Sequence, residues 1–110
     1  MPALKTAFEA VHLDGLIDEA TVACYGRLEQ SAGLFAMIEE YVRLPFLTDI
    51  HGLEATVEAI ELDVSGRLTA ICARGDRTLR IPLVDLPLAP GPDRGADWIA
   101  AYHRWHDSWE

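Results

Sequence analysis

Acidic side chains near the end of a predicted helix are the groups in this sequence best suited to chemistry. Apolar residues recur at helical spacing as far as Leu44, and Glu39 and Glu40 lie in the last turns of that pattern. Pro45 ends the helix, because the residue before a proline is disfavoured in the α region. A helix C-terminus exposes unpaired carbonyl oxygens and carries partial negative charge, so two glutamates there favour a cation. Calcium takes about six to eight oxygen ligands, and carboxylates with carbonyl oxygens are its preferred set.

The spacing leaves alternatives to one shared cation site open. Glu39 and Glu40 can pair with Arg43 at i,i+4 and i,i+3, which contributes about 0.2–0.5 kcal/mol per pair. Glu29 lies on the same helical face as Glu40, but one continuous helix separates the two by about 16 Å. Glu29 therefore shares an ion with Glu40 only if the chain bends near Gly33, and otherwise serves a second site or none.

The other reactive residue types do not form a catalytic motif. The sequence contains no glycine-rich phosphate loop, no GxSxG nucleophile motif and no EF-hand loop. His103 and His106 have a spacing that can hold a transition metal, but zinc needs further ligands, so we expect two solvated histidines. Cys24 and Cys72 are expected to be buried free thiols. We therefore expect a protein that is not an enzyme, and a metalloenzyme built on the two histidines is the least favoured hypothesis.

The negative charge is concentrated in the first part of the chain. Residues 1–63 hold twelve acids and three basic residues and so carry the whole net charge of −9, whereas residues 64–110 are neutral overall. Such an acidic half disfavours nucleic acid and anionic membranes, and it favours a hard cation or a basic partner. Arg74, Arg77 and Arg80 surround one predicted turn, where they can face the acidic half of the same or a neighbouring molecule. With no signal-peptide core and no membrane span, we expect a cytoplasmic protein.

Length and composition predict a single domain, residues 1–110, with three successive parts. These are an acidic helical part, a small β-barrel, and a connector with a C-terminal helix, at residues 1–44, 45–88 and 89–110. In the first part Asp18 is placed to cap a helix that begins at Glu19. Gly26 and Gly33 leave open whether two helices or one interrupted helix precede the barrel.

The second part has the sequence pattern of short strands, and the third part that of a helix. The predicted β-forming segments are Leu53–Leu62, Arg67–Arg74 and Thr78–Leu83, separated by predicted turns at residues 63–66 and at Gly75-Asp76. Pro82 indicates that its strand lies at a sheet edge or soon leaves the sheet. The tail forms one helical stripe of aromatic rings, which we expect in the core: Trp98, Tyr102, Trp105 and Trp109. The predicted fold class is α+β, with N-terminal helices packed on a small five-stranded SH3-like antiparallel barrel and closed by a C-terminal helix.

One block of the sequence resembles the cyanobacterial calcium-binding protein family CcbP and its bacterial relatives. The block consists of Tyr25-Gly26, Glu29-Gln30, Gly33, Ile38-Glu39-Glu40 and Pro45-Phe46. A looser match follows in the strand at residues 55–60, Ile81-Pro82-Leu83, Leu86, Trp98 and Trp105, so that the resemblance spans about residues 17–106. Two departures stand out, because the family's long acidic loop shrinks here to residues 63–66, and residues 35–37 replace a strongly aromatic run.

The resemblance implies an acidic, cytoplasmic, non-EF-hand calcium-binding protein with helices packed on a small barrel. By its position before the Pro45-Phe46 segment, Glu40 is the first metal ligand that the resemblance implies, followed by Glu39 and Glu29. The leading hypothesis is thus Ca²⁺ binding at the corner between helix and barrel, as a buffer or sensor. The alternative hypothesis is a metal-free protein–protein interaction module or homo-oligomer that uses its acidic face to bind a basic partner or a second copy.

Overall fold

The computed structural model describes residues 2–87 and 94–109. Its elements are α1 (Pro2–Ala20), α2 (Arg27–Tyr41), β1 (Phe46–Ile50), β2 (Leu53–Leu62), β3 (Leu68–Arg74), β4 (Arg77–Pro82), the 3₁₀ helix η1 (Leu83–Asp85) and α3 (Arg94–Ser108). The α+β class is therefore as predicted, with helices before and after an antiparallel sheet. The predicted connector falls largely on residues 88–93, which lie outside the described residues.

Tight turns join successive strands of the sheet. His51 and Gly52 link β1 to β2 with φ values of 53° and 83°, the left-handed conformation that a two-residue hairpin turn of this kind requires. The predicted turns at residues 63–66 and at Gly75-Asp76 are confirmed, and each contains a glycine with positive φ. The sheet is thus a meander, in which each strand pairs with the next one along the chain.

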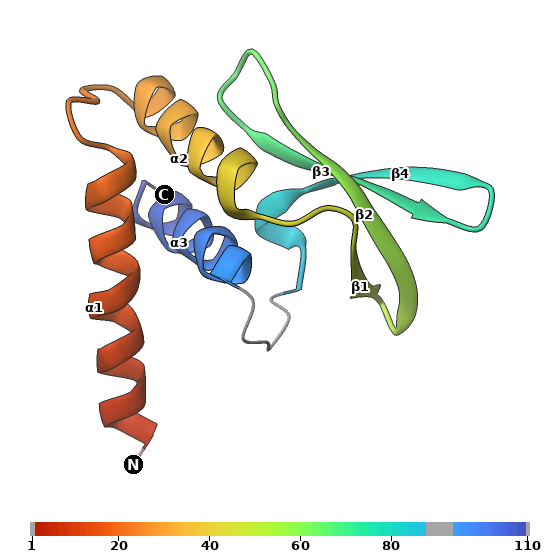
Figure 1. Ribbon diagram of the computed structural model, residues 1–110, viewed down its shortest axis with the longest axis horizontal. Coiled ribbons are helices and arrows are strands. Elements are labelled where there is room, and N and C mark those ends of the chain that lie inside the picture. Colours follow the sequence, from red (N-terminus) through yellow and green to blue (C-terminus); the bar gives the residue numbers. More distant parts are fainter. Residues whose placement is uncertain (1, 88–93, 110) are drawn as a thin grey trace.

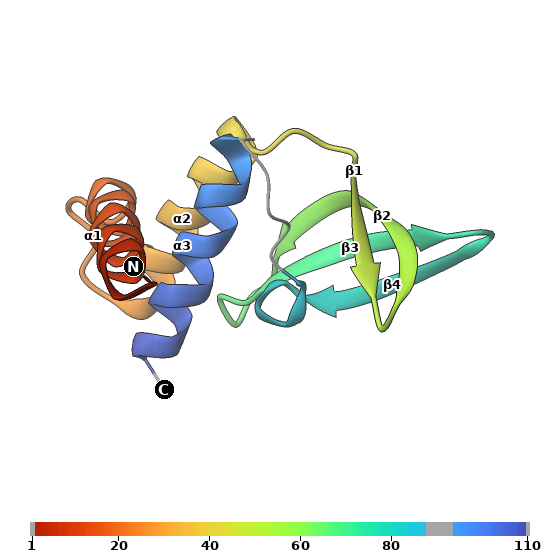
Figure 2. The same ribbon diagram turned by 90° about the horizontal axis from the view of Figure 1, so that it is seen from below.

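The described strands form an open sheet in the order β1-β2-β3-β4. A five-stranded closed SH3-like barrel is therefore not confirmed, because four strands are present in the described residues and β1 and β4 do not pair with each other. A bulge between Val57 and Ala59 shifts the register of β2 against β3, and bulges increase the twist and bend of a strand. Figure 2 shows the resulting curl of the sheet. Both alternatives that Pro82 left open apply, because β4 is an edge strand and ends at Pro82.

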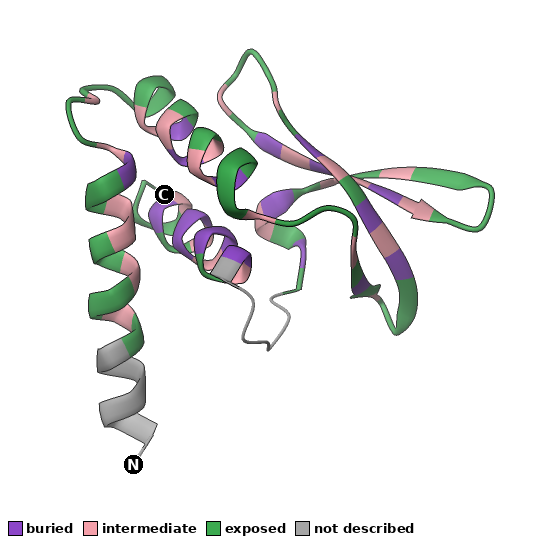
Figure 3. Ribbon diagram, viewed as in Figure 1, coloured by how far each residue is buried: buried purple, intermediate pink, exposed green. Residues whose placement is uncertain are grey.

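The helices and the sheet form successive layers (Figures 1 and 2). The outermost helix is α1, and α2 and α3 lie between it and the sheet. The core lies between these two helices and the inner face of the sheet, with contributions from Leu34, Ile38, Val57, Ala70, Cys72, Leu83, Tyr102 and Trp105. Figure 3 shows buried residues on α2, α3, β2 and β3, whereas most described residues of α1 are exposed or half-buried.

The N-terminal part consists of two separate helices. Because α1 continues through Asp18 to Ala20, the prediction that Asp18 caps a helix beginning at Glu19 is wrong. The second helix begins after Gly26, which occupies its N-cap position. Gly33 does not interrupt this helix; it lies where a β-carbon would come within 2.2 Å of the Ala20 carbonyl oxygen. The glycine therefore allows the end of α1 to approach α2.

The aromatic stripe on α3 is buried except at its last member. Trp98, Tyr102 and Trp105 expose 6%, 2% and 3% of their surface, as the prediction of a core stripe requires. Trp109 is 45% exposed, so the prediction is wrong there, because this residue follows the end of α3 at Ser108 and contacts Trp105 edge to face.

Two smaller expectations concern the cysteines and membrane spans. Cys24 and Cys72 are both free thiols, as predicted; Cys72 is buried in the core, whereas Cys24 is half-buried. None of the helices within the described residues has the length and apolarity needed to cross a bilayer.

Candidate functional site

The last turn of α2 carries the two glutamates that the sequence singled out. The helix ends at Tyr41, and the Val42 backbone N–H donates to the Ile38 carbonyl oxygen over 2.9 Å. Glu39 and Glu40 lie just before this end. A cis peptide bond between Leu44 and Pro45 follows, and β1 begins at the next residue. The glutamates thus stand at the junction between the helical layer and the sheet, as expected from their spacing to Pro45.

Packing against α3 fixes the backbone of this corner. The Tyr41 ring stacks on the Trp98 ring with centroids 5.8 Å apart and planes 12° apart. A β-carbon at Gly95 would lie 2.7 Å from the Val42 α-carbon and 3.0 Å from the Tyr41 carbonyl oxygen, so only glycine allows this approach. Neither Tyr41 nor Gly95 was predicted from the sequence to shape this corner. The only indication in the sequence was that Gly95 lies three residues before Trp98, so that both lie on the same face of the predicted helix.

Both glutamates at the corner are exposed to solvent. No hydrogen bond or ion pair joins the Glu39 or Glu40 carboxylate to another described residue, and the alternative of local pairing with Arg43 is not seen there. Consecutive helical residues point about 100° apart, so one ion can meet both carboxylates only if it lies beyond the helix end. The arrangement offers two oxygen-donor groups beside the last carbonyl oxygens of a helix.

Glu29 lies at the opposite end of the same helix. Its Oε2 accepts a hydrogen bond of 3.0 Å from the Tyr25 backbone N–H, and it stands in the first turn, where negative charge is favourable. Because α2 is continuous from Arg27 to Tyr41, the rise of about 1.5 Å per residue separates Glu29 from Glu40 by about 16 Å. The bend near Gly33 that would bring the two together is absent from this described helix, so they do not share an ion.

Several other carboxylates are engaged within the chain. Asp14 accepts two hydrogen bonds from Arg104, at 2.7 Å and 3.2 Å, and these bonds lower the pKa of Asp14. Asp63 accepts hydrogen bonds from Ser65 and Arg67 in the turn between β2 and β3, and they lower its pKa. Other acidic side chains also have contacts: Asp97 with His12, Glu61 with Arg80, and Asp49 with the Gly52 N–H.

The two histidines of α3 serve different contacts. His103 is half-buried, and its Nε2 lies 2.6 Å from the Leu83 carbonyl oxygen, so the prediction of a solvated side chain is wrong for this residue. The His106 ring lies against the Tyr102 ring with centroids 6.1 Å apart. Among the described residues, no three His, Cys, Asp or Glu side chains gather into a group able to hold a metal ion. Any cation at the α2 corner therefore relies on carbonyl oxygens and water besides Glu39 and Glu40.

The comparisons with known proteins find similarity in structure rather than in sequence. No protein-family model matches the sequence, and no curated protein sequence matches it. The crystal structure of Anabaena CcbP superposes with a TM-score of 0.63 and 16% identity, over 77% of this chain and 80% of that chain. A calcium-binding protein in its calcium-binding form superposes with a TM-score of 0.67 and 17% identity, over 89% of this chain and 91% of that chain. The chain therefore has a CcbP-like fold, and the resemblance seen in the sequence is confirmed at the level of the fold.

Proposed function

We propose that this chain is a calcium-binding protein rather than an enzyme, with its site at the C-terminal end of α2. The observation that carries the proposal is the fold shared with solved proteins that are named for calcium binding, one of them in its calcium-binding form. The exposed carboxylates of Glu39 and Glu40 at the helix–sheet corner add support, because this position corresponds to the block of sequence in which the resemblance is most specific.

Glu40 is the principal ligand in this proposal, and Glu39 is the second. An ion beyond the helix end relieves the unfavourable position of two carboxylates at the negative end of the helix dipole. It also meets carbonyl oxygens of the last turn. Within the described part of the chain, the Ile38 carbonyl oxygen accepts the Val42 N–H, and the carbonyl oxygens after it have no helical partner. Two carboxylates and such carbonyl oxygens supply fewer than the full ligand set, so water completes the shell. We expect a solvated site that prefers Ca²⁺ to Mg²⁺, because Mg²⁺ demands a stricter octahedral geometry.

A calorimetric Ca²⁺ titration of chelator-treated protein tests the proposal. At about 0.1 M salt with Mg²⁺ present, screening removes much of the diffuse attraction of cations to an acidic surface. The wild type and Glu29→Gln should give the same saturable binding, whereas Glu40→Gln should weaken it about tenfold or more, a loss of at least about 1.4 kcal/mol. Glu29→Gln is the matched control, since it removes the same charge from the far end of the same helix.

Two outcomes contradict the proposal. A wild-type trace without saturable heat means that the chain has the fold without the site. Equal binding by wild type and Glu40→Gln places the ion elsewhere.

A change in near-ultraviolet circular dichroism on saturation identifies a sensor, and an unchanged spectrum identifies a buffer.

A further inference from the structure

The two hairpins of the sheet carry opposite charge. Residues 46–62, which form β1 and β2, contain four acids and no lysine or arginine. Residues 68–82, which form β3 and β4, contain three arginines and one aspartate. The described sheet is open, so one of its edges, β1, belongs to the acidic hairpin and the other, β4, to the basic hairpin. Figures 1 and 2 show the β3–β4 hairpin projecting away from the three helices.

Both edges leave the core partly uncovered. On β3, the inward-facing Ala70 and Cys72 are fully buried. Their partners on β4, Ile81 and Leu79, are only partly buried, and so are the inward-facing Phe46 and Ile50 of β1. An edge strand also presents unpaired backbone N–H and C=O groups, which form a template for pairing with another strand. A strand added to either edge would satisfy these groups and cover the exposed part of the core.

Charge decides which strand fits. Two copies of β4 paired about Arg80 bring arginines together, and two copies of β1 paired about Asp49 bring aspartates together. Like charges across a strand pair are destabilising. The contact of β4 with β1 of another copy joins opposite charges instead. In one antiparallel register Arg80 faces Asp49, Leu79 faces Ile50 and Ile81 faces Thr48. This register keeps the inward-facing residues of both strands on the same side of the sheet.

We propose that this chain associates head to tail, with strand β4 of one molecule adding to strand β1 of the next. The occupant of each open edge is a second copy of the chain, selected by the pairing of Arg80 with Asp49. Arg80 already holds one carboxylate, since its Nη2 lies 2.9 Å from Glu61 Oε1 of β2, and both side chains are more than half exposed. Of the two Asp49 oxygens, Oδ1 accepts the Gly52 N–H over 2.7 Å, which leaves Oδ2 as the acceptor for the neighbouring molecule.

A head-to-tail contact has a consequence for the size of the assembly. The surfaces that meet are different, so the contact generates a closed ring or an open filament according to the rotation it imposes. Because the strands are short and the charges exposed, we expect weak association that depends on concentration and decreases with salt. The contact uses neither Glu39 nor Glu40, and it goes beyond the proposed calcium binding. Association measured in chelator therefore tests the strand contact independently of calcium binding.

Sedimentation equilibrium in chelator, from micromolar to millimolar protein, tests the assembly. At about 0.05 M salt the wild type should form species larger than the monomer, and about 0.5 M salt should dissociate most of them. Asp49→Arg and Arg80→Asp should each remain monomeric when alone. An equimolar mixture of these two variants should associate again, because each variant restores the opposite charge that the other lacks.

Control variants separate the edge contact from net charge. Asp18→Arg and Arg27→Asp make the same changes in charge at exposed helical positions, and both should associate like the wild type. Circular dichroism establishes that each variant is folded. The proposal is overturned if the wild type stays monomeric at low salt over the whole range, or if the edge variants associate as the controls do. It is also overturned if the mixture of the two edge variants stays monomeric.

Discussion

At the scale of single residues, the polar atoms of the interior hold the layers in register. The indole N–H of Trp105 donates to Gln30 Oε1 over 2.9 Å and so joins α3 to α2. The hydroxyl of buried Ser31 donates to the Gly66 carbonyl oxygen and joins α2 to the turn between β2 and β3. The Leu68 backbone N–H donates to the Tyr102 hydroxyl oxygen over 3.2 Å. Within the described residues, no buried side-chain nitrogen or oxygen lacks a partner, so these bonds add specificity without an unpaired-group penalty.

His103 makes the stability of the fold depend on pH. Burial lowers the pKa of His103, against smaller opposing effects of the Leu83 carbonyl and of Asp107 and Asp85; His106 acts in the same direction as burial. The folded state therefore favours the neutral imidazole more than the unfolded state does. Above the unfolded pKa, near 6.5, both states are neutral and His103 adds no pH dependence. As the pH falls below 6.5, the unfolded state gains a proton first, so the free energy of unfolding decreases until the folded state is protonated too.

Urea denaturation between pH 8 and pH 5 measures this effect. His103→Gln keeps a donor for the Leu83 carbonyl but does not titrate, so the wild type should lose more stability than the variant as the pH falls. The difference between the two curves removes the contribution of the carboxylates, which titrate in both proteins. Parallel curves would show that His103 has the same pKa in the folded and unfolded states.

The sequence specified some side-chain environments and not others. Periodicity alone predicted the burial of Trp98 and Trp105, because one stripe of a helix must face the core. Periodicity could not predict the burial of His103. This burial depends on a contact with Leu83 of η1, about 20 residues earlier in the chain. For the candidate site, the position of Glu40 at a helix end followed from Pro45. A coordination shell did not follow, because carbonyl oxygens and distant carboxylates are brought together only by the fold.

At the scale of elements, glycines in two helices should respond in opposite ways to the same substitution. Gly15 lies inside α1 with open space around it, so Gly15→Ala should stabilise the protein by about 0.5–1 kcal/mol through helix propensity. Gly33 lies inside α2, where a β-carbon would collide with the backbone of Ala20. Gly33→Ala should therefore destabilise by about 1–3 kcal/mol, since α1 and α2 must move apart.

Thermal and urea denaturation of the two variants provide the measurement. The same chemical change in two exposed-to-half-buried helical positions makes Gly15→Ala the matched control for helix propensity. Stabilisation by both substitutions would mean that α1 does not pack against α2 as closely as the Ala20–Gly33 approach indicates.

The elements themselves were predicted unevenly for identifiable reasons. Strands β2, β3 and β4 are flanked by turns rich in glycine and aspartate, and the sequence predicted segments close to all three. The first strand was missed, because its five residues include the exposed Asp49 and its turn uses His51 at positive φ in place of asparagine or aspartate. A five-stranded barrel was expected because several short strands joined by tight turns suggested a small closed fold. No particular segment of the sequence required a fifth strand, and the two edges of the described sheet do not pair with each other.

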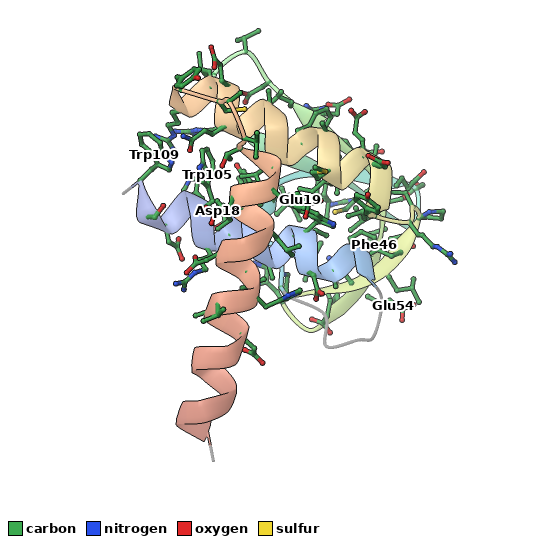
Figure 4. All side chains as sticks on the ribbon, turned by 60° about the vertical axis from the view of Figure 1, so that its left-hand side comes forward. Asp18, Glu19, Phe46, Glu54, Trp105 and Trp109 are labelled. Carbon is green, nitrogen blue, oxygen red and sulfur yellow. The ribbon has the colours of Figure 1, made fainter. Side chains whose placement is uncertain are left out.

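At the scale of the whole molecule, aromatic side chains of α3 pack in the interior and acidic side chains lie on the surface. Figure 4 shows Trp105 and Trp109 near one end of α2 and Phe46 and Glu54 near the other, while Asp18 and Glu19 lie at the end of α1. Trp105 on α3 is buried in the core. The acidic side chains of Asp18, Glu19 and Glu54 are all exposed. The ion pairs among the described residues are exposed as well, and exposed pairs contribute little to stability. Electrostatics in this protein therefore acts mainly through net charge.

Salt and calcium should both change the melting temperature. A net charge of −9 destabilises the compact state by self-repulsion, so NaCl should raise the melting temperature by screening. Calcium at the same ionic strength should raise it further, because a ligand at about one hundred times its dissociation constant stabilises by about 2.7 kcal/mol. For a domain of this size such a gain corresponds to roughly 10 °C or more. Magnesium should give the screening effect with little of this excess.

Glu40→Gln separates screening from binding in the same experiment. The variant should keep the response to NaCl, since it changes the net charge by only one unit, and it should lose the excess stabilisation by calcium. Equal melting temperatures in calcium and magnesium for the wild type would mean that both ions act on the diffuse acidic surface. The calcium proposal would then fail, while the CcbP-like fold and the edge-to-edge association would stand on their own observations.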